Sequence, residues 1–466
     1  MDTNIELSYI GSLPEVLKIF FTGVLFYMQM GVQQLILIAF LNLKYNNQNM
    51  VIAIGSANTQ LFLVFYPLFF GINVSYCVLG SNDFGAKKHY LFGLQLNRCR
   101  FYAYTITLVV GIIYMCINKY VGDILQLTPE VQNYAFIFIS FKIAAIFFEY
   151  EFLFLITYLQ IIGKGLIGTL VLIPSILLFP VFCYIFIYVC DIQMYGPSLT
   201  CLFYNLTTAI IYWALIFILG RNPDHILMFN KDTFSEFWYL VVLTTPLYII
   251  NLLDNFNDEV MSIFANYQGE HNYEGFIVVY SVYKLMATFG NAANNTTNII
   301  ISSLMGVGLH ERAKQFTKYM FISYNAIAII IFLPVVFLKE QIIGLITSTE
   351  KSSAVAHELY YYALLTIFIE IQCSTFYALF VSAGRFYLAL FLFFGFTCFN
   401  TSSIALFLYV ANIEVKGIFI GQAVAKTLMI ILYSIIYLLV IDWEVSSKEI
   451  NKEIEEAEKL ALEQTQ

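Results

Sequence analysis

Twelve apolar runs, each long enough to cross a lipid bilayer as a helix, constrain this chain more than any other feature. A hydrocarbon core about 30 Å thick requires roughly 20 apolar residues in a helix. Lipid offers no partner to backbone N–H and C=O groups, so a spanning run must pair them internally. The sequence therefore predicts an all-α integral membrane protein. The runs are 16–43, 51–80, 93–118, 133–160, 166–190, 197–219, 236–268, 275–305, 316–338, 357–382, 386–411 and 417–441.

Charge and cysteine content exclude several classes of protein. Only 12% of the 466 residues are charged, against about 25% in soluble domains, so no soluble domain remains once the runs are counted. The net charge is −8 and no basic stripe is present, which argues against a nucleic-acid partner. Eight cysteines are scattered singly, without the spacing of metal ligands, so we expect no metal and no cofactor.

Lysines and arginines between the runs predict the orientation in the membrane. If both termini are cytoplasmic, inside loops carry eleven basic residues and outside loops five, as the positive-inside rule requires. We expect a monomeric multi-pass protein of the plasma membrane or of a vacuolar or endosomal membrane. The inside residues are Lys87, Lys88, Arg98, Arg100, Lys164, Arg221, Lys231, Arg312, Lys314, Lys318 and Arg385, and the outside ones are Lys44, Lys119, Lys339, Lys351 and Lys416.

The first six runs resemble the last six. Glu149 precedes Gly163 by fourteen residues, and Glu370 precedes Gly384 by the same fourteen. Repeats of six helices form the two halves of many transporters. We therefore predict twelve transmembrane helices in two pseudo-symmetric six-helix lobes around a central cleft, joined near Arg221–Asp232. The predicted parts are an N-terminal lobe at 1–222, a C-terminal lobe at 223–445 and a charged cytoplasmic tail at 446–466, either an amphipathic helix or a solvated end.

Three acidic residues, Asp254, Asp258 and Glu259, lie inside the seventh run. A central acid costs roughly 2.5–3.5 kcal/mol on insertion, so such residues are functional candidates. One alternative is that the seventeen residues Phe237–Leu253 span the membrane alone and leave the acids in a solvated loop. Val260–Tyr267 continues the apolar pattern without Gly or Pro, which favours an embedded helix and a membrane transporter.

The spacing of these acids suggests an exchange site. Asp254 and Asp258 are four residues apart and share a helix face, whereas Glu259 lies about 100° further round. Burial in an apolar cavity disfavours the charged form of a carboxyl group. Such a site could hold a proton and release it when an organic cation arrives. We therefore expect Asp254 and Glu259 to bind proton and cation in turn.

Other polar residues at membrane depth leave two readings open. Lys284 pairs with Asp254 or Glu259, or extends to an interface. Tyr280 and Tyr283 face a cation or simply pack. In the fourth run, Lys142 lies near Glu149 and Glu151, and these residues provide either a structural ion pair or a functional site. Lys426 in the twelfth run has no assigned role. A polar stripe in the eighth run faces a cavity or bonds to a neighbouring helix, and it comprises Asn291, Asn294, Asn295 and Asn298.

Several short motifs along the chain resemble the eukaryotic branch of the multidrug and toxic compound extrusion (MATE) family over roughly 14–445. In the seventh run, Pro246, Asp254 and Glu259 are spaced by eight and five residues, as in that branch, and Glu370 keeps the family distance to Gly384. The other segments that carry the resemblance are Phe84–Gly93, Met305–Gly308 with Glu311–Lys314, and Lys416–Gly421 with Asp442–Trp443.

The resemblance implies an antiporter that works by alternating access and exports organic cations or related small solutes in exchange for protons, with sodium as the other possible coupling ion. It adds Glu370 to the proton- and cation-binding residues. Ser281 stands where animal members carry a glutamate, and Asp254 where the family has glutamate. The residues expected to tune the site are Asp258, Lys284, Ser281, Asn291 and Asn295.

Three alternatives compete with this prediction. A lipid-linked oligosaccharide flippase of the same superfamily would need several basic residues at membrane depth, where Lys142, Lys284 and Lys426 are the candidates. A sugar-type facilitator lacks support, since its usual loop signature after the second span is absent. A multi-pass membrane enzyme needs clustered catalytic side chains, and the five histidines are dispersed. We therefore predict a transporter and not an enzyme.

Overall fold

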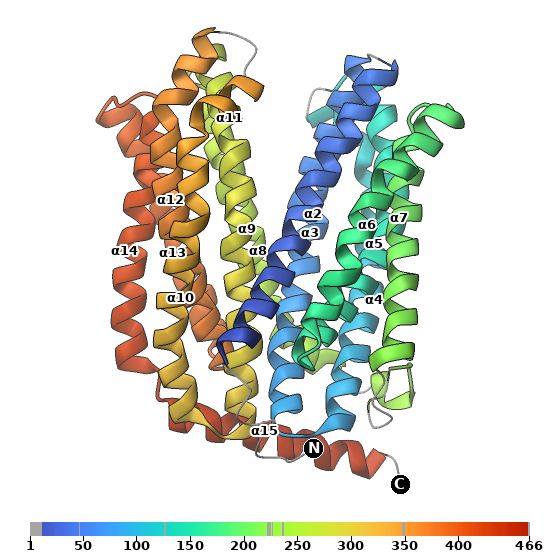
Figure 1. Cartoon of the computed structure of the whole chain (residues 1–466), viewed down its shortest axis with the longest axis vertical. Helices are drawn as coiled ribbons and strands as arrows, with labels where there is room; N and C mark the ends of the chain where they lie inside the picture. Colours follow the sequence, from blue (N-terminus) through green and yellow to red (C-terminus); the bar gives the residue numbers. More distant parts are fainter. Residues whose placement is uncertain are drawn as a thin grey trace. The chain divides into compact units, whose positions relative to one another are not determined.

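The computed structural model describes residues 12–45, 47–124, 127–220, 225, 227–234, 237–346 and 350–464. The predicted linker at Arg221–Asp232 lies partly outside these residues. Helices dominate the described part of the chain (Figure 1). The long ones are α2 (Leu13–Tyr45), α3 (Gln48–Gly85), α4 (His89–Ile124), α5 (Pro129–Ile161), α6 (Gly165–Cys183), α7 (Tyr195–Leu215), α8 (Phe237–Asn266), α9 (Glu270–Val307), α10 (His310–Phe337), α12 (Glu350–Ser382), α13 (Phe386–Ala405), α14 (Lys416–Val440) and α15 (Trp443–Gln464).

Twelve of these helices coincide with the twelve predicted spans, which confirms the all-α prediction. Within the described residues, eleven helices are long and apolar enough to cross a membrane. The twelfth, α5, is equally long but carries three charged residues in its middle. Short helical segments lie between the long ones: η1 (Tyr184–Val189), η2 (Ile216–Gly220), η3 (Lys231–Phe234), α11 (Lys339–Ile346) and η4 (Leu406–Val410).

The chain divides into two compact units. The first lobe consists of Leu17–Asn251 together with the end of α15 from Glu456. The second lobe consists of Leu252–Glu455 together with the start of α2 up to Val16. The division therefore falls inside the helices α8, α2 and α15.

The same backbone pattern recurs in the two lobes at one constant separation along the chain. Positive φ angles occur at Lys87 and Gly308, and again at Gly163 and Gly384, where helices end. Two further pairs, Asp191 with Asn412 and Gln193 with Glu414, keep the same separation. The π-helical segments η1 and η4 keep it as well, since they end at Val189 and Val410. The repeat that the glutamate spacing predicted is thus present in the backbone.

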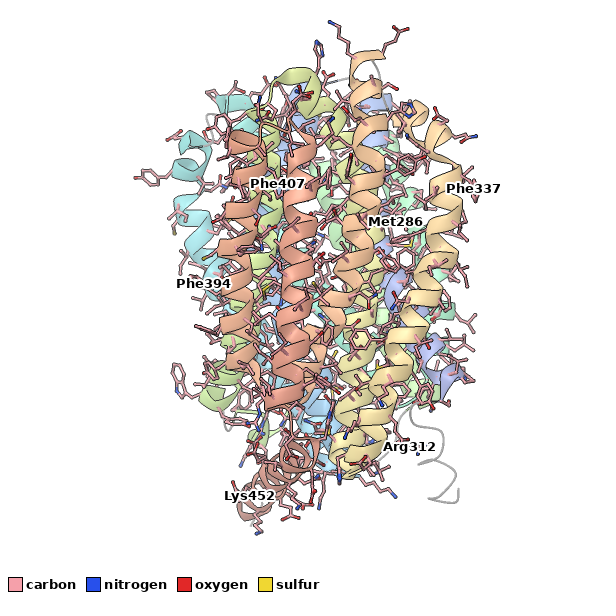
Figure 2. The ribbon with its side chains drawn as sticks, turned by 90° about the vertical axis from the view of Figure 1, so that its left-hand side faces the viewer. Met286, Arg312, Phe337, Phe394, Phe407 and Lys452 are labelled. Atoms are coloured by element: carbon pink, nitrogen blue, oxygen red, sulfur yellow. The ribbon has the colours of Figure 1, made fainter. Side chains whose placement is uncertain are left out.

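Apolar side chains cover the outside of the second lobe. Figure 2 shows Phe337 and Phe394 pointing outward from α10 and α13, and both are exposed. Arg312 and Lys452 both lie at the lower end of the same lobe in Figure 2. Exposed apolar side chains along the helices, with charged residues at an end, are the surface expected of a protein that sits in lipid.

The charged tail forms a helix on the second lobe, which decides between the two predicted forms. Ile450 and Ile454 of α15 are buried. Ser447 Oγ and Asn451 Nδ2 donate hydrogen bonds to the Met305 carbonyl at 3.0 and 3.1 Å. The Met305 carbonyl also accepts from the Gly308 N–H in the turn that ends α9, so α15 adds side-chain hydrogen bonds at the end of α9 while burying its own apolar face.

Close packing of α14 against α13 gives a first testable prediction. A Cβ added to Gly421 would stand 2.7 Å from the Ile404 Cα, so Gly421→Ala must push two helix backbones apart. Overpacking of this kind costs about 1–3 kcal/mol. We expect a lower thermal unfolding midpoint for purified Gly421→Ala. Gly395→Ala is the control, because nothing lies within 4 Å of its added Cβ; equal midpoints for the two variants would contradict this packing.

Candidate functional site

The three acids of the seventh run lie within the regular helix α8, which continues to Asn266. Asp254 is exposed, while Asp258 and Glu259 are partly buried. The helix therefore does not end at Leu253, and the alternative in which these acids lie in a loop is wrong. Asp254 and Asp258 are one turn apart on one face of α8, which places their two carboxyl groups side by side.

Lys284 of α9 forms an ion pair with the Asp258 carboxylate. Its ammonium also lies 5.5 Å from the centre of the Tyr280 ring, within the range of a cation–π interaction. The expectation that Lys284 pairs with Asp254 or Glu259 is therefore wrong. The turn between α8 and α9 determines which residues of the two helices face each other. This pairing could not be predicted from the sequence.

A second ion pair joins Glu370 of α12 to Lys426 of α14. The Lys426 side chain is only 4% exposed and the Glu370 side chain 20%. Lys426 Nζ donates a hydrogen bond to the Tyr283 hydroxyl at 2.9 Å, and Gln422 Nε2 donates to the same oxygen at 3.2 Å. The ammonium is thus enclosed by a carboxylate and a phenol oxygen, and the ring of Tyr283 has its centre 5.5 Å away.

Glycine and aromatic residues shape the surroundings of this ion pair. A Cβ at Gly290 of α9 would lie 3.3 Å from Ser374 Oγ and 3.8 Å from Glu370 Cγ, so the glycine lets α9 approach α12 beside the glutamate. Tyr280 and Tyr283 stack at 5.7 Å between ring centres. The Tyr283 ring therefore packs on Tyr280 while its hydroxyl accepts from Lys426.

Sequence reasoning left Lys426 and Gln422 without a role. A lysine deep in the last apolar run was a usable signal, because a charged side chain at membrane depth normally has a partner. Its partner Glu370 lies on another helix, far earlier in the chain. Only the packing of α14 on α12 identifies the pair.

The remaining predicted tuning residues are distributed unevenly. Ser281 is exposed and its hydroxyl donates to the Ile277 carbonyl of its own helix at 2.8 Å. Asn291 is exposed, whereas Asn295 is buried. Further along the stripe, Asn298 is buried and accepts a hydrogen bond from Ser382 of α12 at 3.1 Å. This end of the stripe bonds to a neighbouring helix, which was one of the two readings.

Glu149 and Glu151 in the middle of α5 are both paired. Lys142 Nζ donates to Glu149 Oε2 at 3.0 Å within the same helix. Arg100 of α4 lies 2.6 Å from the Glu151 carboxylate and packs on the rings of Trp213 and Phe229. Arg100 is therefore a buried residue of a spanning helix, and counting it among the loop residues was wrong.

The second-lobe site gathers opposite charges with an excess of acids. The Asp254 carboxyl group interacts electrostatically with Asp258, Lys284 and Lys426. The Glu259 carboxyl group interacts in the same way with Asp258 and Lys284. Among these described residues, four carboxyl groups thus stand against two ammonium groups when Glu370 is included. An arrangement of this kind can hold an additional cation or protons on the carboxyl groups in excess.

Comparisons with known proteins agree with this architecture. The MatE family model, which describes multidrug and toxic compound extrusion proteins, matches residues 23–185 and 246–404. Protein DETOXIFICATION 28 of Arabidopsis thaliana is 22% identical over 414 residues, covering 84% of this chain and 80% of that protein.

Solved structures of similar proteins support the fold. The eukaryotic MATE transporter AtDTX14 superposes with a TM-score of 0.83 at 13% identity, over 95% of this chain and 98% of that one. The Vibrio cholerae MATE transporter VcmN in its bent form gives 0.79 at 13% identity, over 95% and 98%. The chain accordingly has twelve transmembrane helices in two lobes.

Proposed function

The chain belongs to the MatE family, whose members are membrane transporters and not enzymes, and from this premise we propose that it exports organic cations in exchange for protons. That it is a multi-pass efflux transporter for small molecules follows from the family. The proposal concerns the cationic substrate, the coupling ion and the residues that carry both.

The observation that supports a cationic substrate best is the buried ammonium group of Lys426. Glu370 and Tyr283 surround it with a carboxylate, a hydroxyl oxygen and an aromatic face. These are the groups that recognise organic ammonium ions. The second lobe therefore already contains the chemistry of a cation site, filled by a side chain of the protein.

Proton coupling is proposed for the carboxyl groups that exceed the lysines of this site. Asp254 and Glu259 each interact electrostatically with the nearby carboxyl group of Asp258. A proton on either carboxyl group lowers the negative charge available to a cation, so the two ligands compete. Alternating access would convert this competition into exchange, because protonation on one side of the membrane displaces the cation there.

Vesicles with the purified protein test this function. We expect vesicles with an acidic interior to accumulate a fluorescent organic cation as protons leave. A sodium gradient of equal size and direction should drive little accumulation. Glu259→Gln should lower the proton-driven rate by about tenfold, because hydrogen bonds to charged groups contribute roughly 1.5–3 kcal/mol. Glu444→Gln, on exposed α15 beside Lys448, serves as the control.

The outcomes separate the parts of the proposal. Sodium-driven transport as fast as that expected with protons would identify sodium as the coupling ion. It would not contradict the proposed cation site. Proton-driven transport that is unchanged in Glu259→Gln would remove this residue from the exchange site. We further propose that the protein is a monomer. The distribution of basic loop residues supports the proposal that both termini are cytoplasmic.

A further inference from the structure

The first lobe encloses a buried carboxylate that the exchange described above does not use. Glu149 of α5 is 5% exposed, and its partner Lys142, two helical turns earlier, is 9% exposed. Tyr66 of α3 donates to Glu149 Oε1 at 3.4 Å. Asn205 of α7 donates to Glu149 Oε2 at 3.3 Å. All four of these side chains come from the first lobe.

The internal repeat relates this cluster to the site in the second lobe. Glu149 and Glu370 keep the same separation along the chain as the repeated backbone features. Asn205 and Lys426 keep that separation too. In each lobe, then, the side chain at this position of α7 or α14 contacts the glutamate of α5 or α12.

A tyrosine completes each cluster. Tyr66 lies on α3 and Tyr283 on α9, and these helices end at Gly85 and Val307, just before the paired turns of the repeat. Both lobes therefore hold an ammonium group beside a glutamate and a tyrosine hydroxyl. The ammonium arrives by different routes: α14 supplies it in the second lobe, and α5 supplies it in the first.

The ammonium group comes from non-equivalent positions in the two lobes, so the groups that surround it can be considered apart from the lysine that they bind. In the first lobe the residue equivalent to Lys426 is the neutral Asn205, and the positive charge comes from Lys142 instead. Both lobes share a glutamate that contacts the side chain at the equivalent position of α7 or α14, and a tyrosine hydroxyl in the same cluster. A carboxylate buried to this extent requires a positive partner, because an unpaired buried charge is strongly unfavourable.

We propose that the first lobe contains a binding site for a primary alkylammonium ion, built by Glu149, Tyr66 and Asn205 and filled in the native protein by Lys142. Lys142 acts as a tethered ligand, so the site of the first lobe takes up no free cation. This inference concerns a second site and does not rest on the proposed exchange in the other lobe.

Truncation of the tethered ligand tests the proposal. Lys142→Ala removes Cγ, Cδ, Cε and Nζ, which are the atoms of n-propylammonium. We expect n-propylammonium chloride to raise the thermal unfolding midpoint of this variant in a saturable way, beyond its effect on the wild-type protein, because a ligand that binds the native state stabilises it. The wild-type response accounts for every other site. Sodium chloride at equal ionic strength and neutral n-propanol should give no such gain.

A matched double variant assigns the effect to Glu149. Lys142→Ala/Glu149→Gln has the same cavity without the carboxylate, and its response to n-propylammonium should equal that of the wild-type protein. A gain in the double variant, or no gain in Lys142→Ala, would overturn the proposal. If Lys142→Ala is obtained folded only when n-propylammonium is present during purification, the proposal holds. Failure to fold with n-propylammonium as well as without it would also overturn it.

Discussion

Replacing Glu370 with Gln is expected to slow cation exchange by about tenfold or more and to destabilise the second lobe. The change removes the negative charge beside Lys426, whose ammonium is almost fully buried. A hydrogen bond to a charged group contributes roughly 1.5–3 kcal/mol, and each 1.4 kcal/mol is about a factor of ten. Uptake into vesicles and thermal unfolding of the purified variant measure the two effects.

A double variant distinguishes transport from stability. Glu370→Gln/Lys426→Met leaves no unpaired charge at this pair, so we expect its unfolding midpoint to recover toward the wild-type value, because paired removal of a buried ion pair is often tolerated. Exchange should remain impaired. Ser374→Ala, which loses only a 3.4 Å hydroxyl contact to Glu370, should transport normally. Full transport by the double variant would show that Glu370 serves only to neutralise Lys426.

The largest loss of stability is expected for Arg100→Leu. Arg100 is 8% exposed and Glu151 12%, and Arg100 also donates to the Leu227 carbonyl at 3.2 Å. Removal of one partner from a buried pair costs about 3–5 kcal/mol, because it leaves an uncompensated charge. Thermal unfolding of the purified variant should show a marked drop in midpoint, and Arg100→Leu/Glu151→Leu should restore much of it.

An exposed ion pair of the same residue types provides the comparison. Arg385 and Glu449 lie 3.0 Å apart and are 34% and 54% exposed. Such pairs contribute about 0–1 kcal/mol, so Arg385→Leu should shift the midpoint little. Similar shifts for Arg385→Leu and Arg100→Leu would argue that the Arg100 pair is solvated in the folded protein.

Much of the fold followed from local sequence. The twelve helices and the continuation of the seventh run past Leu253 were predictable, since each depends on residues close together in the chain. The equivalence of Glu149 and Glu370 was predictable because each precedes a glycine by the same fourteen residues. The charged pair of Lys142 with Glu149 was one of the two readings left open, because residues seven apart lie two turns along one helix. The tail left two forms open, and burial of Ile450 and Ile454 on the lobe decided between them.

What tertiary structure alone decided is which charged groups meet. Lys284 meets Asp258, Lys426 meets Glu370 and Arg100 meets Glu151, and each pair joins different helices. Hydrophobicity determines where a chain crosses lipid, because the cost of transferring each residue is set locally. The rotation and axial position of one helix against another depend on side-chain packing across the interface. No stretch of sequence records that relation, so the sequence determined the spans and the acids, and packing determined their partners.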